Sequence, residues 1–314
     1  MTELNARQRR CTAWPNEVER APAQKAMGKA RRWGRQGDGD GNGAGEGDGG
    51  GESGFPKSVI WAIISVSMSR DGTAPLGADT LIVTPTFNER ENLRFFVAAT
   101  LAVAPGAHIL VVDDASPDGT GALADTIAAD DPRVNVLHRP GKLGLGTAYV
   151  DGFTWGLQRT YRYFFEMDAD LSHDPAYLPE FFAALDAGAD LVLGSRNIPG
   201  GGIEGWGPGR HLLSKGGSLY SRLILGVDVH DLTSGYKAFT RGTLERIELP
   251  SLRSNGYSFQ IETVYRALSA GLTVKEVPIV FVDRRAGRSK MSRDIFMEAV
   301  VMVWKLRLAG LRRR

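Results

Sequence analysis

Residues 81–114, LIVTPTFNERENLRFFVAATLAVAPGAHILVVDD, contain the pattern that decides the fold class. A short apolar run at 81–84 is followed by a longer amphipathic segment at 89–103 and then by a second apolar run at 108–112. Short apolar runs are typical of buried strands, and longer amphipathic segments are typical of helices. The stretch therefore begins an alternation of strand and helix, which predicts an α/β fold.

The same alternation continues through the rest of the chain. Further strands are expected at 134–138, 163–167, 191–193 and 274–282, and further helices at 121–129, 147–158 and 178–187. We therefore predict a Rossmann-type mixed sheet flanked by helices.

The two ends of the chain differ from this pattern. Residues 34–54 contain 11 glycines, and such a segment cannot bury enough apolar surface to offset the entropy lost on ordering. We expect residues 1–75 to be a disordered, low-complexity extension and residues 76–292 to be one folded domain. Two explanations of the extension stay open, because it is either a genuine disordered segment or the result of a misplaced start, with translation beginning at Met68.

At the other end, residues 294–311 place apolar side chains along one stripe and are followed by three arginines. A basic amphipathic helix of this kind can lie on an anionic membrane. Residues 293–314 are therefore predicted to be a membrane-associating helix.

Bulk composition excludes several classes of protein. The 38 Lys and Arg residues nearly balance the 36 Asp and Glu residues, which argues against a dedicated nucleic-acid binder. Cys11 is the only cysteine, so neither a disulfide framework nor a thiolate metal site is available, and a reducing compartment is expected. No apolar stretch approaches the roughly 20 residues of a membrane-spanning helix. We therefore expect a peripheral protein on the cytoplasmic face of a membrane.

Acidic residues follow the first two predicted strands. The first strand continues into Pro85-Thr86-Phe87-Asn88-Glu89, and the second ends at Asp113-Asp114. Ligands of open α/β sheets collect at the carboxyl ends of strands, where carboxylates can accept hydrogen bonds from a base and a ribose. A helix cap at 88–89 and a plain turn at 116–119 explain the same residues equally well. A dinucleotide-binding reductase is disfavoured, because no glycine-rich fingerprint follows the first strand.

A second acidic signal follows the strand expected at 163–167. This strand leads into Asp168-Ala169-Asp170. Alternate side chains of an extended chain share a face, so both carboxylates can point toward one cation. Oxygen ligands alone indicate a hard divalent ion such as Mg²⁺ or Mn²⁺. The triplet is informative because of its place after a buried strand, since Asp38-Gly39-Asp40 in the glycine-rich segment has the same spacing.

The chain resembles the polyprenol-phosphate (dolichol-phosphate) mannose synthases, which are inverting GT-A glycosyltransferases of family 2. The resemblance covers about residues 80–305 and is specific because the motifs occur as an ordered set. These motifs are PTFNERENL (85–93), VVDDASPDGT (111–120), KLGLGTAY (142–149), MDADLSHDP (167–175), GSR (194–196), DLTSGYKAF (231–239) and VDRRAGRSK (282–290).

The resemblance implies a role for each matching position. Contact with the donor nucleotide would fall to Pro85, Phe87, Glu89, Val112 and Asp114. Asp168, Ala169 and Asp170 would contact the metal or the diphosphate, with Asp168 and Asp170 as metal ligands. Arg196, Arg284 and Lys290 would bind the donor diphosphate and the acceptor phosphate, and together with Asp170 they form the predicted catalytic set.

Two positions depart from the family pattern. Phe87 stands where many relatives have Tyr, and Ser172 stands where some relatives have a metal-binding Gln. The third protein ligand of the metal is therefore left open.

The implied reaction moves mannose from GDP-mannose to polyprenyl phosphate. Transfer of glucose from UDP-glucose is the alternative, because the motifs do not fix the base or the sugar. A polysaccharide-building transferase is disfavoured by the absence of a Gln-x-x-Arg-Trp motif, and a non-catalytic sensor is disfavoured by the full set of acids and cations. Some relatives work with a membrane-embedded partner subunit, so such a partner is an open expectation.

Three further features have more than one explanation. His173 is either a metal ligand or base, or a loop residue beside the acidic pair. Residues 215–225 either line a lipid channel or pack in the core. Asp231, Ser234 and Lys237 are expected on the acceptor side.

Overall fold

The computed structural model describes residues 74–205, 207–252, 254, 256–282 and 301–308. The predicted extension at 1–75 falls almost wholly outside these residues, and so do Arg284, Lys290 and most of the helix predicted at 293–314.

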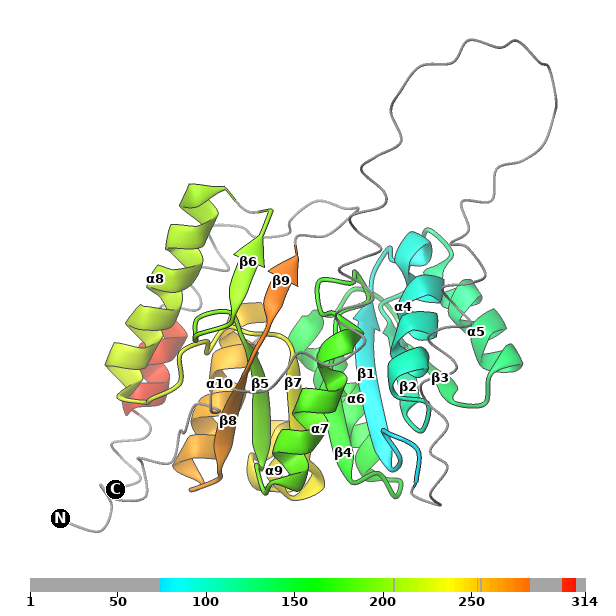
Figure 1. The fold of residues 1–314 in the computed structure, drawn as a ribbon. Coiled ribbons are helices and arrows are strands. Elements are labelled where there is room, and N and C mark those ends of the chain that lie inside the picture. The colour runs from blue at the N-terminus through cyan, green and yellow to red at the C-terminus, as the bar shows by residue number, and fades with distance from the viewer. Residues whose placement is uncertain (1–73, 206, 253, 255, 283–300, 309–314) are drawn as a thin grey trace, which may run out of the picture. The chain divides into compact units, whose positions relative to one another are not determined.

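A seven-stranded sheet forms the centre of the described domain (Figure 1). Its strands lie in the order β3-β2-β1-β4-β7-β5-β8. Strand β7 is antiparallel to β4 and to β5, and the other neighbours are parallel. The bounds are β1 Thr80–Thr86, β2 His108–Asp113, β3 Val134–His138, β4 Tyr163–Glu166, β5 Leu191–Ser195, β7 Lys237–Thr240 and β8 Val274–Pro278. The predicted mixed sheet is therefore confirmed.

Helices cover both faces of this sheet. The α-helices are α4 Arg90–Val103, α5 Thr120–Asp130, α6 Leu145–Leu157, α7 Leu178–Asp186, α8 Pro208–Leu225, α9 Arg241–Arg246 and α10 Gly256–Ser269. The 3-10 helices are η1 Pro175–Tyr177 and η2 Leu249–Ser251. A further helical segment spans 301–308.

The alternation of side chains in β1 shows how the layers form. Leu81 and Val83 pack with α6 and α10, whereas Ile82 packs on the opposite face with α4, α5 and α7. Successive strand residues point to opposite faces, so a strand that is apolar at every position must be covered on both sides. This arrangement explains why the strands appear in the sequence as continuous apolar runs.

The predicted elements agree with the structure to within two residues at each end, with one exception. The strand expected at 274–282 is divided into β8 and β9 Val280–Val282, which pairs with β6 Gly202–Glu204 in a separate parallel sheet. The division occurs at Ile279, whose N–H donates to Ser195 O at 3.0 Å and whose carbonyl accepts from Gly202 N at 3.0 Å. The prediction of one strand was wrong because an apolar run does not reveal a change of sheet.

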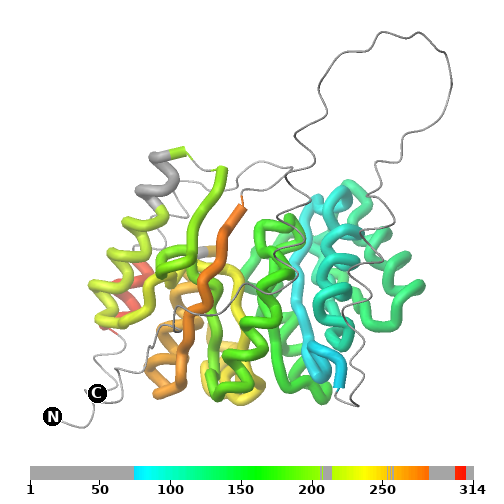
Figure 2. The backbone as a smooth tube through the Cα atoms, viewed as in Figure 1, coloured from blue at the N-terminus to red at the C-terminus, as the bar shows by residue number. Residues whose placement is uncertain are grey.

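The segment 301–308 lies beside α8 (Figure 2). Val303 and Leu306 are buried in the same cluster as Leu225, the last residue of α8. The Nη1 of Arg307 also donates to Leu225 O at 3.5 Å. The expectation for 215–225 is therefore met in part by core packing, since Leu225 is buried while Leu223 of the same helix is exposed. Among the described helices, none combines the length and the hydropathy required to span a bilayer.

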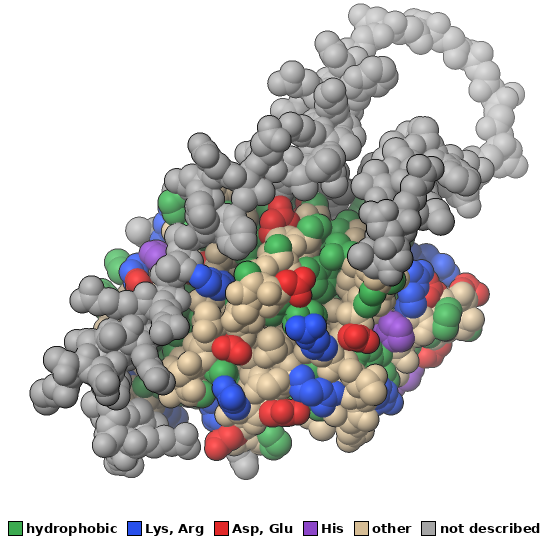
Figure 3. Space-filling view, turned by 60° about the horizontal axis from the view of Figure 1, so that its bottom comes forward, with side chains coloured by type: hydrophobic (Ala, Val, Ile, Leu, Met, Phe, Trp, Pro, Cys, Tyr) green, Lys and Arg blue, Asp and Glu red, His purple; other side chains and the backbone are tan. Residues whose placement is uncertain are grey.

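The face of the domain opposite the carboxyl ends of β1 and β4 has a mixed surface (Figure 3). Acidic and basic side chains are scattered there among hydrophobic and other atoms, and neither charge dominates the visible part of this face. The predicted site residues Asp114, Asp168 and Asp170 lie at the other end, beyond the carboxyl ends of β2 and β4.

Candidate active site

Three of the five non-glycine residues with positive φ in the described part of the chain lie just beyond the carboxyl ends of three adjacent strands. Asn88 follows β1, Ala115 follows β2 and Leu171 follows β4, and their φ angles are 62°, 52° and 63°. Non-glycine residues rarely adopt positive φ, and they cluster at functional sites when they do. The three angles therefore mark this edge of the sheet as the candidate site, in agreement with the predicted position.

Hydrogen bonds tie the loops after β1 and β2 together. Asp113 accepts from Thr86 Oγ1 at 2.9 Å and from Ser116 Oγ at 2.6 Å. Ser116 Oγ in turn accepts the Asn88 N–H at 3.1 Å. Ser116 therefore connects the turn at 116–119 to the loop after β1, which is the structural role that the plain-turn explanation gave to this motif.

Asp118 makes a second tie in the same turn. Its Oδ1 accepts from Thr120 N at 2.9 Å, and its Oδ2 accepts from Arg90 N at 3.2 Å. Burial by itself would raise the pKa of Asp118, but the hydrogen bonds from Thr120 and Arg90 outweigh it and lower the pKa. The carboxylate that fastens α4 to the turn is thus held ionised.

The predicted nucleotide-binding residues lie at the ends of β1 and β2, beside the turn at 116–119. Pro85 and Phe87 are half-buried, Val112 is fully buried in β2, and Glu89 precedes α4. Glu89 Oε2 accepts from Asn92 Nδ2 at 2.9 Å, and the Glu89 side chain makes no cap hydrogen bond. A buried Val112 side chain leaves only its backbone to meet a ligand.

Phe87 has a cation over its ring. The Nζ of Lys142 lies 4.4 Å from the ring centroid, within the range of a cation–π interaction. Phe87 is one of the predicted nucleotide contacts. Lys142, which was not predicted as a site residue, therefore lies beside this subsite.

Arg139 is a residue of this region that the sequence analysis missed. Its Nη1 lies 2.6 Å from Asp114 Oδ1, and its Nη2 donates to Thr147 Oγ1 at 2.6 Å. Asp114 Oδ2 also accepts the Leu143 N–H at 3.2 Å. Arg139 directly follows β3, so its position after a third parallel strand was a usable signal.

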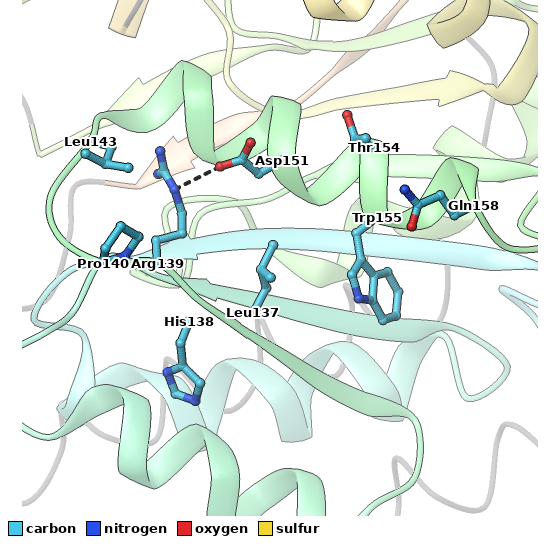
Figure 4. A pocket seen from close by; sticks show the side chains of 9 residues that line it. All are labelled: Leu137, His138, Arg139, Pro140, Leu143, Asp151, Thr154, Trp155 and Gln158. Atoms are coloured by element: carbon cyan, nitrogen blue, oxygen red, sulfur yellow. Dashed lines mark ion pairs between the residues drawn. The ribbon is translucent and has the colours of Figure 1, made fainter.

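A half-open pocket of about 390 Å³ lies on the outer side of Arg139 (Figure 4). The Nε of Arg139 lies 3.0 Å from Asp151 Oδ2 at its wall. The remaining lining comes from Leu137, His138, Pro140, Leu143, Thr154, Trp155 and Gln158. None of these nine lining residues belongs to the predicted site.

The acidic triplet lies just beyond β4. Asp168 Oδ1 accepts from the Tyr149 hydroxyl at 3.1 Å, and Asp170 Oδ1 accepts from Ser172 N at 3.1 Å. Ala169 is buried, so any contact it makes with a ligand goes through its backbone. Asp170 is only 5% exposed and therefore lies in a recess rather than on an open surface.

Arg196 directly follows β5 and is held by a buried carboxylate. Its Nε and Nη2 donate to Asp231 Oδ2 and Oδ1 at 2.7 and 2.8 Å. Burial alone would raise the pKa of Asp231, but the charge and hydrogen bonds of Arg196 outweigh it and lower the pKa. A two-bonded pair of this kind fixes the plane of the guanidinium. Asp231, which was expected on the acceptor side, thus contacts Arg196.

His173 lies among the predicted metal and phosphate residues. It is buried, and burial is the main reason that its pKa lies below the ordinary value. Asp168 and Asp170 act in the opposite direction, and the nearby cations Arg196 and Lys237 lower the pKa further. The Asp168 N–H donates to His173 Nδ1 at 3.0 Å. The Phe281 ring lies 6.2 Å from the His173 ring and 5.5 Å from Arg196 Cζ. The acidic triplet and Arg196, predicted separately, therefore both lie near this imidazole.

Lys237 occupies a different place from the one expected. It is fully buried, faces Glu166 in the register of β4 and β7, and lies 3.7 Å from its Oε2. Its ammonium group donates to Gln260 Oε1. Burial lowers the pKa of Lys237 to about 8 and raises the pKa of Glu166 to about 7. Lys237 therefore lies beneath the acidic triplet, and no surface is open to an acceptor there.

The donor set can be tested for its fit to a divalent cation. Asp168 and Asp170 offer carboxylate oxygens, and no group of three His, Cys, Asp or Glu side chains suited to a metal occurs among the described residues. Mg²⁺ commonly binds through one or two carboxylates plus substrate phosphates and water. The pair fits such a cation, with its remaining ligands supplied by a diphosphate and water.

Comparison with known proteins identifies the family of the chain. The family model described as glycosyl transferase family 2 matches residues 81–248. The polyprenol monophosphomannose synthase of Mycolicibacterium smegmatis is 52% identical over 231 residues, which are 73% of this chain and 87% of the relative. The undecaprenyl-phosphate mannosyltransferase of Micrococcus luteus is 49% identical over 238 residues, which are 74% of this chain and 98% of the relative.

Solved structures show a similar fold. Glucosyl-3-phosphoglycerate synthase from Mycobacterium tuberculosis, in complex with Mn²⁺, UDP-glucose and phosphoglyceric acid, superposes with a TM-score of 0.53 at 18% identity. The match covers 82% of this chain and 85% of that chain. The likeness confirms the predicted GT-A-like arrangement. From the matched model and the two curated relatives, this chain belongs to glycosyl transferase family 2.

Proposed function

We propose that this protein transfers mannose from GDP-mannose to polyprenyl phosphate, with inversion and with Mg²⁺ or Mn²⁺. The names of the two curated relatives, a polyprenol monophosphomannose synthase and an undecaprenyl-phosphate mannosyltransferase, support the sugar and the acceptor. The single structural observation that carries the proposal is that the Asp168 N–H donates to His173 Nδ1, while the Phe281 ring lies against both His173 and Arg196. The acidic triplet and Arg196 therefore lie on either side of one imidazole–phenyl contact.

The chemistry requires charge compensation rather than a base. A lipid phosphate is already an anion at neutral pH, so no proton has to be removed from the nucleophile. The difficulty is to bring it close to a donor diphosphate. Arg196 supplies a fixed cation for phosphate oxygens, because Asp231 sets the direction of its guanidinium. A bound divalent ion would neutralise charge on the departing nucleoside diphosphate.

The donor nucleotide would lie at the ends of β1 and β2. Pro85, Phe87, Glu89, Val112 and Asp114 are the proposed contacts. Arg139 orients Asp114 through their 2.6 Å ion pair, so this carboxylate has one preferred direction toward a base or ribose. We include Arg284 and Lys290 as proposed phosphate-binding residues on the strength of the family motif alone.

The membrane surface is the proposed site of action, on its cytoplasmic face. Support comes from apolar side chains exposed on two neighbouring elements: Leu219 and Leu223 on α8, and Val301, Trp304 and Leu308 on the segment 301–308. Leu223 is 71% exposed and Trp304 is 49% exposed. Apolar side chains with this spacing on a basic helix favour an interfacial position. A membrane-embedded partner subunit is compatible with the proposal.

The experiment is a transfer assay with two donors. Purified full-length protein receives labelled GDP-mannose or labelled UDP-glucose, together with polyprenyl phosphate and Mg²⁺, and the lipid phase is extracted. The proposal predicts labelled lipid from GDP-mannose only. Label from UDP-glucose would assign the glucose reaction instead, and donor binding without labelled lipid would indicate a sensor.

A further inference from the structure

Asp168 is contacted from two sides by side chains outside the acidic triplet. The Tyr149 hydroxyl, from α6, donates to Asp168 Oδ1 at 3.1 Å. The backbone N–H of Asp168 donates to His173 Nδ1 at 3.0 Å. Both side chains are buried, so water competes little for either bond.

Tyr149 is a rigid donor. Its ring is nearly parallel to Phe259, with centroids 6.0 Å apart and an interplanar angle of 7°, and it also stacks on Phe153 at 5.9 Å. Phe153 lies one turn further along the same helix, α6, and Phe259 lies on α10, so the tyrosine ring packs between its own helix and a second one. The hydroxyl can only point at Asp168 from one direction.

His173 is a rigid acceptor. Because a backbone N–H donates to Nδ1, that nitrogen carries no proton, and the neutral ring has its proton on Nε2. The ring stacks on Tyr236 with centroids 5.1 Å apart, and Gly235 leaves room for it, since a Cβ there would lie 3.3 Å from His173 Cε1. The lone pair of Nδ1 is in use, which excludes this atom as a metal ligand in the present arrangement.

We propose that Tyr149 and His173 are positioning residues that set the direction of the Asp168 carboxylate and thereby strengthen the binding of the divalent cation. The inference rests on the proposed function, because it requires a cation at Asp168 and Asp170. Groups that orient a metal-binding side chain typically change metal affinity by about 10–100-fold. One bond fixes the carboxylate and the other fixes the backbone that carries it.

The test is the affinity of the full-length protein for Mn²⁺ in the presence of GDP, measured by electron paramagnetic resonance. Tyr149→Phe removes one hydroxyl and keeps the ring stack, and we expect it to weaken Mn²⁺ binding about 10–100-fold. The matched control is Tyr163→Phe, which removes a hydroxyl that donates to Asp186 at 2.9 Å in another part of the sheet. The control is expected to bind Mn²⁺ as the wild type does.

A second pair of variants tests the histidine. His173→Ala removes the acceptor, whereas His173→Asn offers a side-chain oxygen to the same N–H. We expect a loss of Mn²⁺ affinity with Ala and a partial recovery with Asn. Equal losses in both variants would overturn the role of the acceptor and indicate that ring packing matters instead.

The outcomes separate the inference from the proposed function. Wild-type Mn²⁺ affinity in both Tyr149→Phe and His173→Ala overturns the positioning role and leaves the proposed metal site standing. Failure of the wild-type protein to bind Mn²⁺ with GDP overturns both. Raising the Mn²⁺ concentration should restore most of the transfer rate of Tyr149→Phe, because the groups proposed to contact the reactants are unchanged.

Discussion

The two halves of the candidate site are built in different ways. The loops after β1 and β2 are held mainly by backbone N–H groups that donate to carboxylates and hydroxyls, such as the Arg90 N–H to Asp118 and the Asn88 N–H to Ser116. The region after β4 and β5 is held by charged side chains that meet across long separations, such as Arg196 with Asp231, 35 residues away. The half after β1 and β2 is therefore fixed by backbone hydrogen bonds, and the half after β4 and β5 is fixed by charged side chains.

This difference has an energetic consequence. Bonds between a carboxylate and an exposed backbone N–H replace similar bonds to water, so each contributes about 1 kcal/mol. Buried charges such as Lys237 and Glu166 lose water that they cannot regain, so their removal or separation has larger effects. Mutations should therefore disturb the half after β4 and β5 much more than the half after β1 and β2.

The largest effect is expected for Asp170→Ala. Loss of this carboxylate should lower the transfer rate by about a hundredfold or more, because the charge that builds on the leaving diphosphate loses its compensation. Labelled lipid formed per minute measures the effect, and circular dichroism should show a retained fold. Asp174→Asn is the control, since it removes a nearby negative charge while keeping an oxygen for the Ala176 N–H. A near-wild-type transfer rate for Asp170→Ala would contradict the proposal that Asp170 binds a divalent cation needed for transfer.

The next effect is on stability. Asp231→Ala leaves the buried guanidinium of Arg196 without its two-bonded partner, and breaking such a pair typically costs about 3–5 kcal/mol. Urea unfolding of the variant and the wild type measures the difference. A loss of unfolding free energy below about 1 kcal/mol is typical of an exposed ion pair. Such a loss would show that the half after β4 and β5 depends on charge no more than the half after β1 and β2.

A pH series tests the buried pair directly. Glu166 has a raised pKa of about 7, so folding binds a proton between about pH 4.5 and 7, and this contribution to stability is lost as the pH rises through 7. Lys237 has a lowered pKa of about 8, so its charged form opposes folding below pH 8, and this penalty fades as the pH rises from 8 toward 10.5.

Compared with the double variant Glu166→Gln, Lys237→Met, the wild type should therefore be at its greatest disadvantage between about pH 7 and pH 8. The free energies of unfolding are measured with urea in EDTA, so that no metal contributes. A difference between the two proteins that does not vary with pH would contradict the assigned shifts.

The smallest effect is expected in the nucleotide half. Ser116→Ala removes the hydroxyl that joins Asp113 and Asn88, and we expect a loss of about 1 kcal/mol with a modest rise in the KM for the donor. Thr126→Ala removes a hydroxyl that bonds only within α5, and it should leave the KM unchanged. A larger effect of Ser116→Ala than of Asp231→Ala would reverse the comparison.

The same difference explains how much of the molecule was predictable from sequence. The strands and helices expected from local apolar patterns occur in the structure, but β6, β7, α8, α9 and α10 were not predicted. The acidic strand ends lie together at one edge of the sheet, which stays the predicted site. Asp113, Ser116 and Asp118 were visible as a turn because each has a partner two or three residues away. Their bonds to Thr86, Asn88 and Arg90 appear only in the fold. The division of 274–282 into two strands was not predictable, because it depends on pairing with 202–204.

Long-range partners were beyond the reach of local patterns. Nothing near Lys237 in the sequence indicates that it is buried between Glu166 and Gln260. Arg139 was missed although its position directly after β3 was a usable signal, and only its ion pair with Asp114, 25 residues away, depended on the fold. Tyr149 lay within a quoted motif, but its bond to Asp168 appears only in the fold.

The most direct test of the account is a crystal structure with GDP and Mn²⁺, in which anomalous scattering locates the metal. We predict one Mn²⁺ between the Asp168 and Asp170 carboxylates and the diphosphate, with the Arg196 guanidinium on the same side. A nucleotide bound instead in the pocket beside Arg139 and Trp155, with no metal at the acidic pair, would contradict it.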